Sequence, residues 1–141
     1  MSYQIIDTRT VSILYFKKTK LFFYTIKPNS EVGFSDIEEV FRVTKELAGN
    51  DDVYSITDIR NLGFEHLSKE VTEYTARNPF IKQQLKNAII IEGIGQKIFG
   101  NFYLNVLRPA RQTKLFNTPE SALKWLGVND QEVLNVLSKY N

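Results

Sequence analysis

The sequence has no cysteine, one histidine and no long apolar run, and each absence excludes a class of protein. Without cysteine the chain cannot form disulfides, thiolate metal sites or a cysteine nucleophile. The single histidine, His66, argues against a metal site, because such sites are built from clusters of ligands. No run approaches the roughly 18–20 apolar residues that span a bilayer, and the first residues lack the basic and apolar regions of a secretory signal. We therefore expect a cytoplasmic protein with no metal, no cofactor and no membrane contact.

The net charge is also small, because 18 Lys and Arg residues are balanced by 16 Asp and Glu residues, which leaves +2. This excess is too small to indicate nucleic-acid binding on its own. Positive charge gathers locally at Lys17–Lys20 and again at Arg108, Arg111 and Lys114. We interpret both segments as solvated loops, because neither has the interleaved aromatic residues on which bases stack. The sequence thus predicts no nucleic-acid partner.

The length of 141 residues, with 43% hydrophobic and 24% charged residues, is ordinary for one globular domain. There is no repeat, linker or low-complexity segment, so we expect a single domain over residues 1–141. Patterns of alternation and helical spacing predict the order β-β-α-β-α-β-α-β-α-α. Strands are expected at residues 11–16, 21–26, 53–59, 87–91 and 114–117, and helices at residues 35–48, 68–77, 95–108, 119–126 and 129–139. Because strands alternating with helices require right-handed crossovers, we predict an α/β fold in which helices pack against a mixed, mostly parallel sheet of about five strands.

Two of these helices have clear start signals. Ser35, followed three residues later by Glu38, has the capping-box pattern. Thr118 can cap a later helix with its hydroxyl, Pro119 fits the first helical position, and Gly127 can take the left-handed conformation that ends it.

The spacing of apolar residues also predicts which side chains form the core. In the helix that follows residues 93–95, a wide apolar stripe is formed by Ile94, Ile98, Phe99, Phe102, Val106 and Leu107. Across the whole chain we expect the following to be largely buried: Ile56, Ile89, Ile90, Phe102, Leu115 and Trp125.

Several short motifs occur together in an order that resembles a group of bacterial proteins of unknown function classed as STAS-like, a name that joins sulphate transporters with anti-sigma-factor antagonists. The motifs are Asp58–Arg60, then residues 67–74, 88–91, 100–104, 113–116 and 122–126. The resemblance is strongest over residues 11–126, with the predicted helix 129–139 appended. It implies a STAS-like fold, structurally related to the lipid-carrying CRAL-TRIO domains, and it does not transfer an activity.

The resemblance makes Ser68 a candidate regulatory phosphosite. STAS-group antagonists are phosphorylated on a serine near the start of the helix after the third strand, in an Asp-Ser-Ser-Gly-like setting, and Ser68 is the nearest positional counterpart. That acidic-serine-glycine pattern is missing here. A phosphate at a helix N-terminus would be stabilised by free amides, but the favoured interpretation of Ser68 is a helix N-cap.

Two loops at strand ends are candidate ligand or anion sites. Asp58 follows a strand at the edge where open α/β sheets bind ligands, although pairing with Arg60 or with backbone amides is the favoured interpretation. Gly93 and Gly95 precede a helix and could hold an anion on backbone amides. Because a third glycine and the lysine-serine of a P-loop are both missing, an ordinary strand-to-helix turn is favoured there.

No convergent set of titratable residues is visible, so we do not expect an enzyme. Ser68, His66 and Asp58 together supply the residue types of a catalytic triad, but a triad is recognised by geometry and not by presence. We expect a non-enzymatic interaction module that binds another protein and forms a homodimer. The alternatives are a small-molecule or lipid carrier, suggested by the CRAL-TRIO kinship, and an enzyme of unknown type. A chain of this length leaves little room for a large cavity beside its core.

Overall fold

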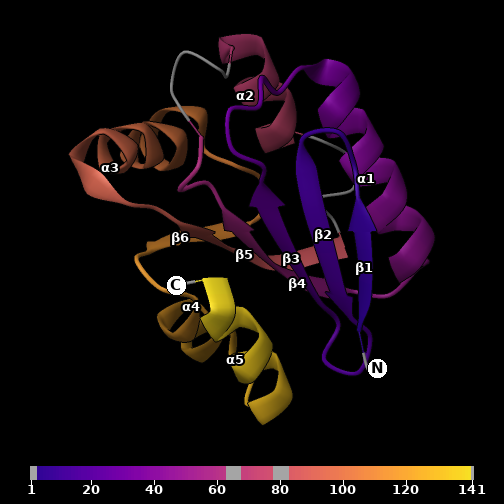
Figure 1. Cartoon of the computed structure of the whole chain (residues 1–141). Helices are drawn as coiled ribbons and strands as arrows, with labels where there is room; N and C mark the ends of the chain where they lie inside the picture. The colour runs from indigo at the N-terminus through magenta and orange to yellow at the C-terminus, as the bar shows by residue number, and fades with distance from the viewer. Residues whose placement is uncertain (1–2, 63–67, 78–82, 141) are drawn as a thin grey trace.

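The computed structural model of the protein describes residues 3–62, 68–77 and 83–140. Strands and helices alternate along most of the chain (Figure 1). Their bounds are β1 (Gln4–Asp7), β2 (Val11–Phe16), β3 (Leu21–Ile26), α1 (Phe34–Ala48), β4 (Val53–Asp58), α2 (Lys69–Arg77), β5 (Gln84–Ile90), α3 (Gly93–Phe102), the π-helical turn η3 (Tyr103–Leu107), β6 (Gln112–Phe116), α4 (Pro119–Leu126), α5 (Gln131–Leu137) and the 3₁₀ turn η4 (Ser138–Tyr140). Within the described residues, no helix is both long and apolar enough to cross a membrane.

The six strands lie side by side in chain order, from β1 to β6. β1, β2 and β3 pair antiparallel, whereas β3 to β6 pair parallel, so the predicted mixed, mostly parallel α/β sheet is confirmed. The expected number of about five strands is corrected to six, because β1 was not predicted. β1 has only four residues and lies at the sheet edge, where Ile5 is half exposed. It therefore lacks the buried run by which the other strands are recognised.

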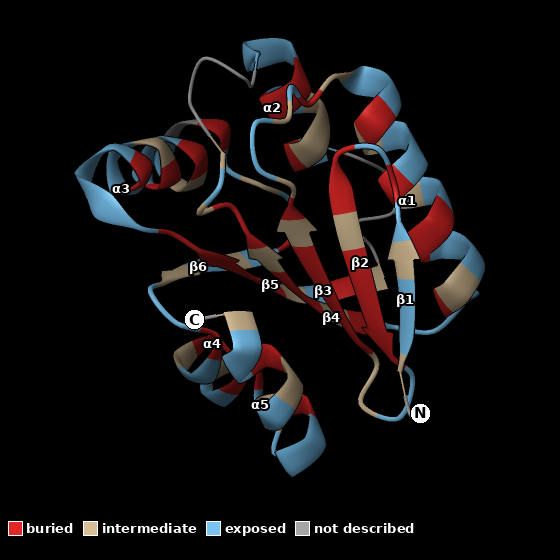
Figure 2. Cartoon of the chain, in the orientation of Figure 1, coloured by how far each residue is buried: buried red, intermediate tan, exposed pale blue. Residues whose placement is uncertain are grey.

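Helices cover both faces of the sheet (Figure 1). α1, α2 and α3 each connect two neighbouring parallel strands. Right-handed crossovers that proceed in one direction along a sheet place their helices on the same face, which we call the α1–α3 face. α4 and α5 follow the last strand and cover the opposite face, the α4–α5 face. Burial is concentrated on the central strands between these two layers (Figure 2).

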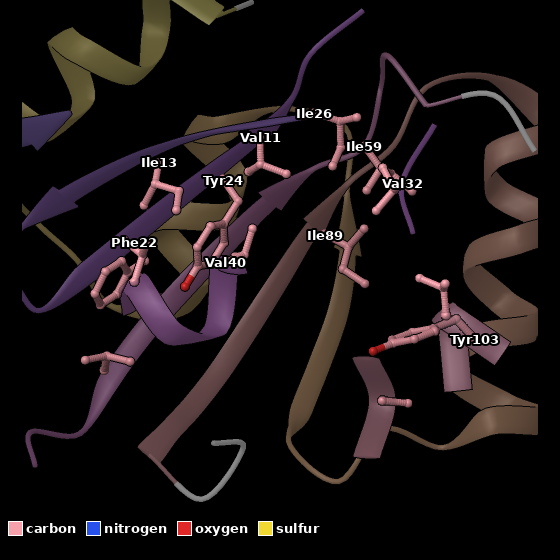
Figure 3. Close-up of a cluster of buried hydrophobic side chains, with 14 of the residues drawn as sticks. Val11, Ile13, Phe22, Tyr24, Ile26, Val32, Val40, Ile59, Ile89 and Tyr103 are labelled. Atoms are coloured by element: carbon pink, nitrogen blue, oxygen red, sulfur yellow. The ribbon is translucent and has the colours of Figure 1, made fainter. Parts of the chain in front are cut away.

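Each face of the sheet has its own apolar cluster, because successive residues of a strand point to opposite sides. On β5, Ile89 belongs to the cluster under α1–α3, and its neighbour Ile90 belongs to the cluster under α4–α5. Figure 3 shows part of the first cluster, where Phe22 and Tyr24 from β3 lie beside Val40 of α1. The cluster under α1–α3 includes the hydroxyl-bearing Tyr24 and Tyr103, and the candidate site lies on this face.

The predicted cap of α4 is confirmed, and that of α1 is wrong. Thr118 Oγ1 accepts a hydrogen bond from the Ser121 amide at 3.2 Å, and Gly127 ends the helix at φ 77°. α1 instead begins after Gly33, whose amide donates to the Asp36 carboxylate at 2.9 Å. The carboxylate of Asp36, one residue beyond Ser35, therefore satisfies the free amide at this helix start.

The orientation of α3 differs from the prediction. Gln96 and Gly100 face the sheet, while Ile94, Ile98 and Phe102 are 80%, 66% and 42% exposed. Gly100 permits this orientation, because a Cβ atom there would lie 2.7 Å from a side-chain methyl of Leu115. The predicted burial of Phe102 is therefore wrong, and Ile94 and Ile98 of the predicted stripe face outward.

The other expectations for the core hold in part. Ile56, Ile89 and Ile90 are buried, as predicted. Leu115 and Trp125 are only half-buried, and the Trp125 ring packs at the surface against Phe116, with their centroids 5.5 Å apart.

Candidate functional site

Asp58, at the end of β4, forms a two-pronged ion pair with Arg60. The guanidinium donates from Nε to Oδ1 at 2.9 Å and from Nη2 to Oδ2 at 2.7 Å, and the Arg60 amide adds a bond to Oδ1 at 3.0 Å. Hydrogen bonding to Asp58 raises the pKa of Arg60 above its ordinary value. Arg60 Nη2 also donates to the backbone oxygen of Tyr140. The predicted pairing is thus present, and it ties the loop after β4 to the C-terminal turn.

Ser68 lies at the start of α2, where it acts as the predicted N-cap. Its Oγ accepts a hydrogen bond from the Val71 amide at 3.1 Å, and its carbonyl accepts from the Thr72 amide at 3.1 Å. The residue is exposed, so its hydroxyl faces solvent as well as the helix end. Phosphorylation of Ser68 stays a prediction.

Gly93 and Gly95 lie in the first turn of α3. Gly93 has φ +79°, a left-handed conformation that favours glycine. The side chain of Gln96 accepts from the Glu92 amide at 2.8 Å and donates to two carbonyls in the loop after β4, at 3.0 and 3.1 Å. Gln96 therefore fixes this helix start against the sheet, and anion binding by the two glycines stays a prediction.

His66 lies outside the described residues, so the distances from it to Ser68 and Asp58 are not part of the structure. Within residues 3–62, 68–77 and 83–140, no group of three or more acidic, histidine or cysteine side chains is arranged to hold a metal ion. The structure brings Asp58 and Arg60 together, and among the described residues no hydrogen bond or ion pair joins either of them to Ser68.

An apolar cavity of about 110 Å³ lies on the α1–α3 face. The sheet and all three covering helices contribute to its lining, which includes Ile37 of α1, Thr75 of α2, Phe99 of α3 and Ile89 of β5. Figure 3 shows the ring of Tyr103 projecting from the helix toward the strands, on the side where Ile89 lies. The cavity therefore lies between the helices and the sheet, and it is partly open to solvent.

Most polar side chains that line the cavity are hydrogen-bonded within the protein. Asn87 Oδ1 accepts from Ser55 Oγ at 2.8 Å and from Thr57 Oγ1 at 3.1 Å. On α2, the hydroxyls of Thr72 and Thr75 donate to carbonyls one turn earlier, each at 2.9 Å. The two threonine hydroxyls and Asn87 Oδ1 are therefore already hydrogen-bonded within the protein.

Arg111, the residue before β6, is the exception. It is only 9% exposed and lines the cavity. Its Nη1 donates to the carbonyl of Thr75 and its Nη2 to the hydroxyl of Tyr103, both at a long 3.3 Å, while Nε has no partner. It forms no ion pair with any carboxylate in the described part of the chain. The sequence interpretation of this segment as a solvated loop is therefore wrong at Arg111.

Arg111 also affects the two tyrosines that lie near it. Burial raises the pKa of Tyr103 and the pKa of Tyr24, and the positive charge of Arg111 opposes both shifts. Tyr24 is further held by Thr44 of α1, with 2.8 Å between the two hydroxyl oxygens. Both phenols are consequently neutral at physiological pH, and neither supplies the negative charge that Arg111 lacks.

The family to which the chain belongs follows from its match to known proteins. A family model described as "Domain of unknown function (DUF7793)" matches residues 14–128. The chain belongs to the DUF7793 family. The matched region includes Arg111 and α3, whereas β1 and α5 lie outside it. Among curated proteins there is no match.

Among solved structures, this DUF7793 chain is similar to an uncharacterized protein of the DUF3478 family with a SpoIIAA-like fold, from Shewanella loihica PV-4. The two share 16% sequence identity and a TM-score of 0.49, over 88% of this chain and 91% of that chain.

Sequence reasoning missed Arg111 as a candidate site residue, although the chain contains a signal for it. Arg111, Thr113 and Leu115 alternate, and Leu115 packs on the α1–α3 cluster. Extending the alternation of β6 back by one step places Arg111 on the same face. The cavity itself has no such signal, because its lining comes from elements distant in the sequence of this DUF7793 domain.

Proposed function

We propose that the protein is a non-enzymatic cytoplasmic interaction module and that two copies associate through the outer side of α3. The carrying observation is the exposure of Ile94, Ile98 and Phe102, at 80%, 66% and 42%. Single exposed apolar residues are common on protein surfaces, but these three are spaced by four residues and form one ridge. A contiguous apolar ridge of this kind marks a contact surface.

The composition of α3 supports the same proposal. The helix is apolar on both sides, since Phe99 and Gly100 pack toward the sheet while the ridge faces outward. Apolar residues that line up on the outer side of a helix favour cover by a partner, although the polar residues Lys97 and Asn101 are also exposed on α3. A second copy of the ridge is a suitable cover, because rows of side chains spaced by four residues pack into one another when two helices cross.

A carrier of large lipids is less well supported. The cavity of about 110 Å³ is smaller than the roughly 300–1,000 Å³ of ordinary ligand sites. A long acyl chain would therefore require the α1–α3 layer to move away from the sheet.

Sedimentation velocity over a concentration series tests the association. We expect the wild-type protein to shift from monomer to dimer, and we expect Ile98→Asn to weaken dimerisation about tenfold or more, because it places a polar amide at the centre of the ridge.

Ile5→Asn is the matched control, since Ile5 is 52% exposed but lies on β1. This variant should dimerise like the wild type. A wild-type protein that stays monomeric at its highest concentration, or an equal loss of dimer in both variants, would show that the ridge is not a self-association surface.

A further inference from the structure

The Arg111 guanidinium is buried without a hydrogen-bond acceptor for every donor. Arginine stays protonated in proteins and carries five N–H donors. Here the charge is nine-tenths buried, two donors make long bonds of 3.3 Å to uncharged oxygens, and Nε has no acceptor. Burying a cation without a counter-charge is unfavourable, and the described residues place no anion beside Arg111.

The atoms left on Arg111 suit a carboxylate. Nε and a terminal nitrogen of a guanidinium form a planar fork that binds both oxygens of a carboxylate side by side. Tyr103 accepts from Arg111 through its hydroxyl oxygen, and its O–H proton is its remaining donor. Nε is enclosed, so a carboxylate that displaced the atoms around it would receive bonds from both side chains.

The rest of the cavity determines what the carboxylate is attached to. Its lining is almost entirely apolar, with Ile26, Ile37, Ile89 and Phe99 among its residues. The hydroxyls of the threonines that also line it, and Asn87 Oδ1, are bonded within the protein. One positive charge in apolar surroundings matches one negative charge on an apolar body, so a highly charged or sugar-bearing ligand does not fit.

The volume limits the size of that body. An apolar cavity of roughly 150 Å³ accommodates benzene. The cavity here, about 110 Å³, therefore suits a body of roughly four to six carbon atoms, such as a branched alkyl group or a phenyl ring. Long fatty acids exceed it.

We propose that the cavity on the α1–α3 face binds a small apolar monocarboxylate, with Arg111 as the residue that receives the carboxylate. The ligand's body lies between Ile89 of β5 and Phe99 of α3, and Tyr103 closes the site beside Arg111. This site is separate from the outer ridge of α3, so it stands whether or not the protein dimerises.

Titration of isoleucine-methyl-labelled protein, followed by NMR, tests the proposal with two acids and their neutral amides. The probes are 3-methylbutanoate against 3-methylbutanamide and benzoate against benzamide. We expect at least one acid to saturate a single site that shifts the Ile89 methyl signals. Its amide should bind about tenfold or more weakly, because it lacks the charge that pairs with Arg111. Dodecanoate should not compete, since its chain is too long.

Two variants separate the charge from the cavity. Arg111→Met should reduce the preference for acid over amide from about tenfold or more to about one, since it keeps the length of the side chain and removes the charge. Val32→Phe leaves Arg111 in place and fills the cavity that Val32 lines, so it should abolish binding of acid and amide alike.

Three results would overturn the proposal. The first is that neither acid saturates the wild-type protein, and the second is that acid and amide bind equally. The third is that chloride or sulfate displaces the acid at comparable concentration, which would make Arg111 a non-selective anion site. These comparisons use the wild-type protein, so they remain decisive even if Arg111→Met does not fold.

Discussion

The two faces of the sheet are packed differently although they share the same strands. The α4–α5 face is filled by apolar side chains, among them Phe16, Phe23 and Leu137, which are almost completely buried. The α1–α3 face contains a cavity and buried polar atoms that have no partner in the described structure, among them Tyr15 Oη and Arg111 Nε. The first face is packed for stability, and the second retains features that cost stability and that a bound ligand would use.

The largest expected difference in stability between the two faces comes from truncating two adjacent side chains of β5 that point to opposite faces. Ile90→Ala, on the packed face, should lower the free energy of unfolding by about 4 kcal/mol, near the upper end of the range for buried isoleucine. Ile89→Ala, beside the cavity, should cost about 2 kcal/mol, because its side chain already borders empty space and loses fewer contacts. Urea denaturation of both variants measures the difference.

The pair is well matched, since both residues are isoleucines in one strand and are 0% and 8% exposed. Equal losses, or a larger loss for Ile89→Ala, would show that the cavity does not weaken packing on the α1–α3 face.

Enlarging a side chain on each face should give changes of opposite sign. Ala88→Val adds two methyl groups to the packed face, where Ala88 is 0% exposed, and should destabilise the protein by about 1–3 kcal/mol through overpacking. Val32→Ile extends into the cavity and should stabilise it by up to about 0.8 kcal/mol, the value of one buried methylene. Thermal unfolding monitored by circular dichroism would detect both shifts, and a destabilising Val32→Ile would mean that the cavity cannot accept added volume.

The elements that could be predicted from sequence are those whose signals are local. α4 has its cap, first-turn proline and terminal glycine within ten residues, and all three act as expected. The orientation of α3 could not be predicted, because it depends on the approach of Gly100 to Leu115 of another element. The predicted stripe is divided in the structure: Phe99 and Leu107 pack on the core, whereas Ile94, Ile98 and Phe102 face outward. Apolar spacing along one helix does not show which of these residues faces the sheet.

The same distinction holds for the candidate site. The Asp58–Arg60 pair and the Ser68 cap join residues two or three positions apart, so the sequence indicates them. The cavity forms only where three helices meet the sheet, so the place of Arg111 in its lining is set by the tertiary structure. The basic residues around Arg111 favour a solvated loop, whereas its alternation with Leu115 favours burial. In the folded protein Arg111 is buried.

Removing one helix cap on each face should have small effects, and it tests whether the two faces differ only in the packing of their cores. Ser68 caps α2 on the cavity face and Thr118 caps α4 on the packed face, through bonds of 3.1 and 3.2 Å. Ser68→Ala and Thr118→Ala should each lower the free energy of unfolding by about 1 kcal/mol, and Ser68→Gly by only a few tenths, because a cap satisfies a local amide and does not depend on the core beneath it. Denaturation curves for the three variants measure these losses. If Ser68→Ala leaves the curve unchanged while Thr118→Ala shifts it, α2 unfolds separately from the rest of the protein, and the contrast between the faces is one of whole layers and not of a cavity.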